Sequence, residues 1–162
     1  DVGYSFEILN SVIRINQSQK TIMFPKIRNY FKGDLKGKRI AVWGLAFKPD
    51  TDDIREAPAL YLIEKLLEDG AEICAYDPEA MDNVKSELGT DIQYAANEYD
   101  VLHNCDALLI CTEWGIFRNP DFEQIKQHLK ELVIFDGRNL FDIEEMNSKG
   151  FYYSSIGRKL IE

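Results

Sequence analysis

The sequence predicts an α/β fold, a doubly wound parallel sheet with helices on both faces, preceded by a long N-terminal helix. From Lys38 onward, strand-like and helix-like segments alternate with short connections, as in repeated right-handed βαβ units. Several strand segments are continuously apolar, which is typical of strands buried on both faces. Residues 39–58, RIAVWGLAFKPDTDDIREAP, pass from an apolar run through Gly44 and a polar loop into a helix start, the opening of many nucleotide-binding folds.

The N-terminal segment, residues 4–31, has the periodicity of a helix. Pro25 should kink this helix or divide it in two, and Gly33 and Gly37 mark its end. The helix carries more apolar surface than a surface helix needs, so we expect it to pack on the domain behind it, to form an interface, or to do both. The apolar positions that define the period are Phe6, Leu9, Val12, Ile13, Ile22, Met23 and Ile27.

The remaining elements follow from their apolar patterns. Strands are predicted at residues 39–43, 72–76, 107–111, 132–136 and 151–154, with a weaker candidate at 92–95. Helices are predicted at residues 57–69, 79–88, 96–104, 121–130 and 142–148. In the first of these helices, Leu60, Ile63 and Leu66 lie at helical spacing. Pro58 suits its first turn, and Gly70 supplies its stop.

Composition restricts the function classes. The chain of 162 residues fits one domain and has a net charge of −9, which argues against binding to nucleic acid or to an anionic membrane surface. It has neither a signal-peptide pattern nor an apolar run of the ~18 residues that a membrane-spanning helix needs, so we expect a cytoplasmic protein. The chain starts at Asp1 directly in helical sequence, as a segment of a longer protein would.

Polar residues follow the carboxyl ends of the predicted strands, where ligands bind in such sheets. Lys48 follows strand 39–43, Trp114 follows 107–111, and Arg138 follows 132–136. With Rossmann-like strand order these strands are neighbours, so the three side chains would share one crevice. Two cations beside an aromatic ring suit an anion attached to a planar group, and a nucleoside diphosphate fits that description.

The first loop lacks the three-glycine fingerprint of dinucleotide-binding folds, since Leu45, Ala46 and Phe47 follow Gly44. Asp77, after the second strand, occupies the place where those folds bind a ribose. Without the glycines, a helix N-cap is the favoured interpretation of Asp77.

Each candidate for the anion site has a structural alternative. Lys48 and Arg55 lie among four acidic residues between positions 50 and 56, and they could form local ion pairs on a solvated loop. Arg138 could be a turn residue, and Trp114 could belong to the core. The residues alone leave these alternatives open.

The residues predict no nucleophile, catalytic dyad or metal site. The three cysteines, Cys74, Cys105 and Cys111, lack CxxC spacing and fall in apolar strands or at a helix end, so they are interpreted as packing residues. His103 and His128 lie on separate predicted helices without acidic partners nearby. Physical chemistry alone therefore predicts a nucleotide-type anion site without visible catalytic groups.

Several motifs together resemble a known family. They are GLAFKPDTDDIREAPA at 44–59, YDP at 76–78, TEW at 112–114, FDGRN at 135–139 and SIGR at 155–158. They are similar to the C-terminal, UDP-binding domain of the UDP-glucose 6-dehydrogenases, within the UDP-glucose/GDP-mannose dehydrogenase family. Residues 1–32 resemble the end of the central helix that joins the two domains of these enzymes and forms their dimer interface. Residues 33–162 would then be the UDP-sugar-binding domain.

The resemblance implies roles for individual residues. Phe47 and Lys48 resemble the substrate-contacting pair after the first strand, and Arg138 resembles an arginine that reaches the substrate. Arg55 resembles an arginine that reaches NAD across the cleft between the domains, whereas Trp114 remains either a substrate contact or a core residue. The family oxidises the C6 alcohol of a nucleotide sugar to a carboxylate with two NAD, through a cysteine nucleophile.

This chain departs from the family pattern in lacking both the G-x-G-x-x-G segment and the G-G-x-C-F-P-K-D cysteine segment. We therefore expect it to depend on an N-terminal NAD-binding domain, to bind UDP-glucose weakly at best by itself, and to turn nothing over alone. Alternatives are the same domain of a UDP-N-acetylhexosamine or GDP-mannose dehydrogenase, or a standalone nucleotide-binding or scaffold domain. A homodimer through residues 1–32 is a further expectation.

Overall fold

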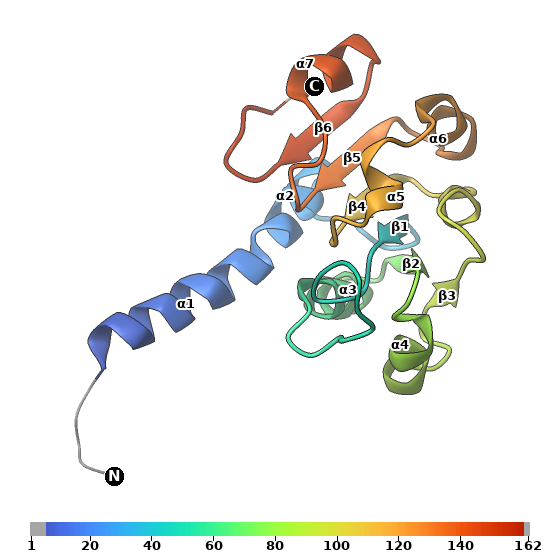
Figure 1. Ribbon diagram of the computed structural model, residues 1–162. Helices are drawn as coiled ribbons and strands as arrows, with labels where there is room; N and C mark the ends of the chain where they lie inside the picture. The colour runs from blue at the N-terminus through green and yellow to red at the C-terminus, as the bar shows by residue number, and fades with distance from the viewer. Residues whose placement is uncertain (1–5, 161–162) are drawn as a thin grey trace.

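Figure 1 shows the computed structural model, which describes residues 6–160 of the chain. Its centre is a parallel sheet of six strands in the order β3-β2-β1-β4-β5-β6, which confirms the predicted fold class. This is the order of a doubly wound fold, in which the strand order reverses between β1 and β4: β2 and β3 extend the sheet on one side of β1, and β4 to β6 extend it on the other. The strands are β1 (Arg39–Trp43), β2 (Glu72–Tyr76), β3 (Gln93–Tyr94), β4 (Ala107–Ile110), β5 (Val133–Asp136) and β6 (Tyr152–Ser155).

Helices cover both faces of the sheet (Figure 1). The connections contain α3 (Pro58–Glu68), α4 (Met81–Leu88), the 3-10 helix η1 (Asp100–Leu102), α5 (Gly115–Arg118), α6 (Phe122–His128) and α7 (Ile143–Ser148). The stop predicted for α3 is confirmed, because Gly70 follows the helix with φ 86° and donates its N–H to the carbonyl of Leu67. Pro58 occupies the first turn of α3, as expected.

The N-terminal segment forms two helices, α1 (Glu7–Thr21) and α2 (Met23–Tyr30), so the predicted division is confirmed. The break lies at Ile22 because Pro25 has no N–H and is tolerated only in the first turn of the following helix. Met23 and Ile27 anchor α2 in the core, whereas α1 has no buried residue and projects from the domain (Figure 1). Residues 4 and 5 of the predicted helix lie outside the described residues.

The helix predicted at residues 96–104 does not form, and only η1 is helical there. The side chain of Asn97 accounts for this, because its oxygen accepts hydrogen bonds from the N–H groups of Tyr99 (2.9 Å) and Asp100 (2.8 Å). Such a local side-chain bond competes with helix and starts a tight turn. The short helix α5 was not predicted, and the predicted bounds of β4, β5 and β6 differ from the observed ones by one residue.

The core lies on both faces of the sheet. Trp43 of β1 is fully buried and stacks on Phe117, with 4.8 Å between the ring centroids. Its indole N–H donates a hydrogen bond of 2.8 Å to the carbonyl of Glu98, which satisfies the one polar atom of this large side chain. Of the helices within residues 6–160, none combines the length and the apolar character needed to cross a membrane.

Candidate functional site

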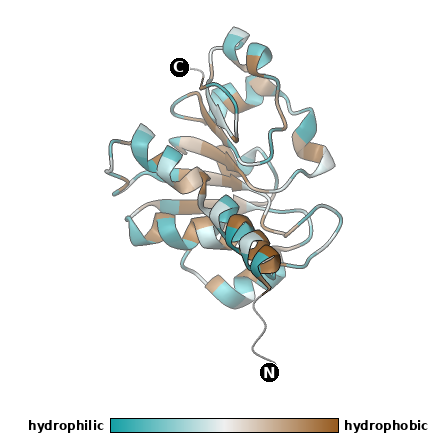
Figure 2. Ribbon diagram, turned by 90° about the vertical axis from the view of Figure 1, so that its left-hand side faces the viewer, coloured by the Kyte–Doolittle hydropathy of each residue, from teal (hydrophilic) through white to brown (hydrophobic). Residues whose placement is uncertain are grey.

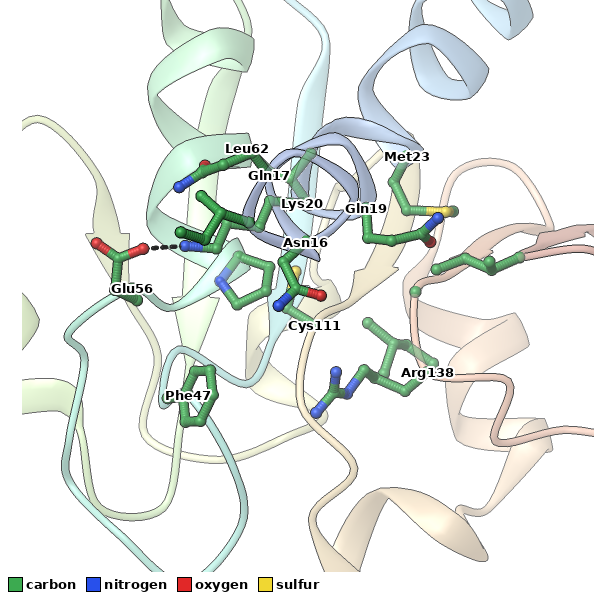
Figure 3. Close-up of a pocket in the computed structure, with 15 residues that line it drawn as sticks. Asn16, Gln17, Gln19, Lys20, Met23, Phe47, Glu56, Leu62, Cys111 and Arg138 are labelled. Carbon is green, nitrogen blue, oxygen red and sulfur yellow. Dashed lines mark hydrogen bonds and ion pairs between the residues drawn. The ribbon is translucent and has the colours of Figure 1, made fainter. Parts of the chain in front are cut away.

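A cavity of about 590 Å³ lies between α1 and the carboxyl ends of β4 and β5 (Figure 3). This is the edge of the sheet, beside the reversal of strand order, where doubly wound folds bind ligands. The volume lies within the range of small-ligand sites. The residues that line the cavity are Ile13, Asn16, Gln17, Gln19, Lys20, Met23, Phe47, Glu56, Pro58, Leu62, Ile110, Cys111, Gly137, Arg138 and Ile156.

Arg138 reaches this cavity from the loop after β5, and the carboxylate of Asp136 fixes that loop. Asp136 is fully buried and accepts hydrogen bonds from the N–H groups of Arg138 (2.8 Å) and Leu140 (2.7 Å). It also accepts a bond of 2.8 Å from the hydroxyl of Tyr153, whose pKa is raised by burial and by the neighbouring charge of Asp136. The backbone that carries Arg138 is therefore held before any ligand binds.

The guanidinium of Arg138 is held from outside the cavity. Its Nε donates a short hydrogen bond to the carboxylate of Glu113, which lies after β4. Glu113 therefore neutralises and orients the arginine.

The adjacent Gly137 lets the loop pass close to β4, because a Cβ at this position would lie 2.8 Å from the carbonyl oxygen of Ile110.

The first loop, residues 44–48, is fixed by the buried carboxylate of Asp77, directly after β2. One oxygen, Oδ2, accepts hydrogen bonds from the N–H groups of Leu45 (2.7 Å) and Ala46 (3.0 Å) and from the indole N–H of Trp114 (3.0 Å). These bonds hold the backbone that presents Phe47 to the cavity.

The other oxygen of Asp77, Oδ1, accepts hydrogen bonds from the N–H groups of Glu79 (2.9 Å) and Ala80 (2.8 Å). The helix after this turn starts at Met81 with Ala80 as its N-cap. The sequence pattern favoured an N-cap at Asp77, and this was wrong by one turn. Asp77 instead closes the turn that precedes α4.

These contacts occupy the position where dinucleotide-binding folds hold a pyrophosphate. The backbone N–H groups of Leu45 and Ala46 are taken by a carboxylate of the chain itself. Gly44, with φ 88°, allows Thr112 so close that a Cβ at Gly44 would lie 2.4 Å from the Thr112 Cβ. The first loop therefore does not fit a dinucleotide, and the cavity lies instead between α1 and the neighbouring strand ends.

Of the residues predicted to bind substrate, the structure brings Phe47 and Arg138 to the same cavity (Figure 3). Lys48 is exposed and near Asp53, and it is not among the described residues that line the cavity. Trp114 is 7% exposed and bonded to Asp77, as in the core alternative. The single crevice expected for Lys48, Trp114 and Arg138 is therefore not seen, and this placement does not support Trp114 as a ligand contact.

Arg55, predicted to contact NAD, lies on the exposed loop before α3 with a side chain that is 87% exposed. Its Nε and Nη2 donate hydrogen bonds of 2.9 and 2.7 Å to the two carboxylate oxygens of Asp53. This partner and, to a smaller extent, the charge of Lys48 lower the pKa of Asp53 to about 2. The local ion pair considered from the sequence is therefore present.

Sequence reasoning missed the contribution of α1 to the cavity. Asn16, Gln17 and Lys20 line it, and the ammonium of Lys20 pairs with the carboxylate of Glu56, which precedes α3 (Figure 3). The signal was present in the spacing, because Ile13, Asn16, Gln17 and Lys20 lie at i, i+3, i+4 and i+7 on one helix face. That face mixes apolar and polar residues, as the wall of a binding site does.

The three cysteines are free and buried, as expected. Burial raises the pKa of Cys105 to about 11 and that of Cys111, which lines the cavity, to about 12. Both are therefore protonated thiols near neutral pH and poor nucleophiles. His103 and His128 meet with 4.2 Å between their ring centroids, although they belong to separate segments. Within the described residues, no group of three or more metal-ligating side chains converges.

Comparison with known proteins agrees with the family resemblance of the sequence motifs. The UDP-glucose/GDP-mannose dehydrogenase family, UDP binding domain, matches residues 41–143. The chain is 41% identical over 159 residues to the UDP-glucose 6-dehydrogenase TuaD of Bacillus subtilis, covering 98% of this chain and 34% of that protein. It spans about a third of the length of such curated relatives.

Two solved structures extend this likeness to three dimensions. A UDP-glucose dehydrogenase from the archaeon Pyrobaculum islandicum superposes with a TM-score of 0.74 at 28% identity, over 90% of this chain and 31% of that one. The UDP-N-acetyl-mannosamine dehydrogenase Cap5O from Staphylococcus aureus gives a TM-score of 0.66 at 28% identity, over 89% and 32%. The extent of the family match, together with the fold and the cavity at the carboxyl edge of its sheet, shows that this chain belongs to the UDP-glucose/GDP-mannose dehydrogenase family and carries its UDP binding domain.

Proposed function

We propose that this chain binds the UDP portion of the substrate in an NAD-dependent UDP-glucose 6-dehydrogenase, an oxidoreductase that converts UDP-glucose to UDP-glucuronate. One observation carries the proposal: Arg138 and Phe47, both within the stretch that matches the UDP binding domain, face one cavity of about 590 Å³. A guanidinium is suited to a diphosphate, and an aromatic ring offers a face to the uracil base.

The two residues have different tasks in the proposed complex. The terminal amino groups of Arg138 form charge-assisted hydrogen bonds with phosphate oxygens, while Glu113 keeps Nε occupied. Phe47 is 46% exposed, so ligand binding removes part of its apolar surface from contact with water, which favours binding. Lys48 is the next residue on the same loop and serves as an outer cation near the phosphate or sugar oxygens.

NAD is assigned to a part of the protein outside this chain, because the first loop here is closed by Asp77 and does not fit a dinucleotide. When bound there, NAD supplies the hydride acceptor for the oxidation. Arg55 is the residue of this chain assigned to NAD, on the resemblance of its motif to the family pattern. Its side chain lies open to solvent on the loop before α3, and it would exchange its ion pair with Asp53 for the cofactor. Cys111 is not the nucleophile, because its thiol is buried and protonated.

The projecting helix α1 is assigned to an interface. Ile8, Leu9 and Ile15 are more than half exposed, and Figure 2 shows hydrophobic residues along this helix. An apolar helix surface of this kind is covered in most soluble proteins. We assign it to residues 1–32 acting as a dimerisation and inter-domain helix, with residues 33–162 as the substrate domain. The cytoplasm is the proposed location, because NAD and nucleotide sugars are available there for polysaccharide precursors.

The sugar is the part of the substrate that this chain specifies least. A relative of known structure at 28% identity acts on UDP-N-acetyl-mannosamine, as its name states. The alternative is therefore a dehydrogenase of a UDP-N-acetylhexosamine or of GDP-mannose. A panel of these three substrates tested on the full-length protein identifies the sugar, and UDP-glucose is expected to give the highest kcat/KM.

Calorimetric titration of the full-length protein with UDP-glucose tests the binding assignment. Arg138→Ala should weaken UDP-glucose binding by about 1.5–3 kcal/mol, the range for hydrogen bonds to charged groups. Lys48→Ala, which removes an exposed cation outside the cavity lining, should weaken it by less. Arg158→Ala is the matched control, because this arginine donates to the carbonyl of Phe141 and is not among the described residues that line the cavity. Arg55→Ala should instead raise the KM for NAD.

Unchanged affinity for UDP-glucose in both Arg138→Ala and Lys48→Ala would refute the anion site. The 162-residue chain alone should bind UDP weakly at best and should not oxidise UDP-glucose. NAD-dependent turnover by this chain would contradict the proposed division of roles.

A further inference from the structure

We propose that Lys20 of α1 is a second cation of the diphosphate site and that the carboxylate of Glu56 is a counter-ion which the diphosphate displaces. This inference rests on the proposed function, because it concerns the same cavity. It adds a residue from outside the stretch that matches the UDP binding domain, and it assigns an inhibitory role to a neighbouring acidic residue.

Lys20 differs from most of α1 in its surroundings. Its side chain is 17% exposed, although the helix has no fully buried residue and most of its positions are open to solvent. The side chain lies along the cavity wall, and its ammonium forms an ion pair with Glu56 at the cavity rim (Figure 3). Phe47 and Arg138 face this helix from the opposite side of the same cavity (Figure 3).

Glu56 is suited to separate from Lys20 when an anion binds. Its side chain is 72% exposed, so water replaces the lysine readily when the pair separates. An ion pair at such an exposed position contributes little net stability. A diphosphate, which carries more charge than one carboxylate, competes well for the ammonium. Glu56 also lines the cavity, so its carboxylate would repel a bound diphosphate if it stayed beside Lys20.

The second ion pair of the site is arranged differently. Glu113 is not among the described residues that line the cavity, and it takes only the Nε of Arg138. Nη1 and Nη2 of Arg138 form no hydrogen bond within the described part of the chain, so they remain available to a ligand. Glu113 therefore contacts Arg138 from outside the cavity, whereas Glu56 occupies the ammonium of Lys20 on the side where the ligand would bind. The two glutamates should have opposite effects on affinity.

Calorimetric titration of the full-length protein with UDP at low salt tests this inference. Lys20→Gln should weaken UDP binding by about ten- to a hundredfold, the effect expected for a lost hydrogen bond between charged groups. Lys20→Arg keeps the charge and should retain most of the affinity. Glu56→Gln should tighten binding by about two- to fivefold, with the gain shrinking as salt screens the competing charge.

The pair Lys65 and Glu68 on α3 provides a matched control, since it is a Lys–Glu ion pair outside the cavity. Lys65→Gln and Glu68→Gln should leave UDP affinity unchanged. If Lys20→Gln binds UDP as tightly as the wild type while Arg138→Ala does not, the inference is wrong and the proposed function stands. Weaker binding by Glu56→Gln would likewise overturn it. If the wild type does not bind UDP, the proposed function itself fails.

Discussion

Replacement of Asp77 by alanine should destabilise the chain far more than loss of an ordinary surface carboxylate. The side chain is 1% exposed and accepts hydrogen bonds from five N–H donors. Four of these bonds lie in buried surroundings, those from Leu45, Ala46, Ala80 and Trp114. At about 1 kcal/mol of net stability for each bond, the expected loss is about 4 kcal/mol.

Urea denaturation of the 162-residue chain measures this loss. With a slope of ~2 kcal/mol per molar urea, Asp77→Ala should lower the unfolding midpoint by ~2 M without a change of slope. Asp121→Ala is the matched control, because Asp121 also accepts two backbone N–H groups, at the exposed N-terminus of α6. Loss of an N-cap of this kind costs about 1 kcal/mol.

A destabilisation by Asp77→Ala no larger than that by Asp121→Ala would refute the reasoning. It would mean that water satisfies the donors as well as the carboxylate does, and that the first loop does not depend on Asp77. The position of Phe47 would then need another explanation.

Two further predictions follow from the backbone and from the exposed loop. Gly44→Ala should destabilise the chain by about 2–5 kcal/mol in the same assay, because positive φ and the contact with Thr112 both penalise a Cβ. The control is Gly150→Ala, which should show the backbone cost alone, because Gly150 has φ 79° and no neighbour within 4 Å. The carboxyl of Asp53 should titrate by NMR near its lowered pKa of about 2, so its ion pair with Arg55 persists above that pH and is lost as the pH falls through it. Arg55→Gln should raise this midpoint towards the ordinary value, and an unchanged midpoint would exclude the pairing in solution.

The sequence was sufficient for the sheet because its signals are local. Pro58 and Gly70 bound a helix that forms as predicted, and the apolar strands need no knowledge of their partners. The prediction failed at residues 96–104, where one side-chain hydrogen-bond acceptor, Asn97, decides against a helix. It also missed α5, whose four residues are too few to show a period.

The candidate site was predictable only where topology alone fixes a position. Phe47 and Arg138 follow strand ends, so their approach to one edge of the sheet could be expected. The direction of the Trp114 indole could not, because it is set by Asp77, 37 residues earlier. The pairing of Lys20 with Glu56 joins residues 36 apart, and it depends on how α1 leaves the domain.

A buried aspartate fixes each of the two loops that carry Phe47 and Arg138. Asp77 and Asp136 lie at the ends of β2 and β5, and each places a buried carboxylate against backbone N–H groups of a loop. A loop held in this way is already ordered, so a ligand need not supply the free energy to order it. The N–H groups that face a phosphate in dinucleotide folds are thereby used up. Affinity for an anion must then come from side chains such as that of Arg138, and it should fall steeply with salt because these cations are partly exposed.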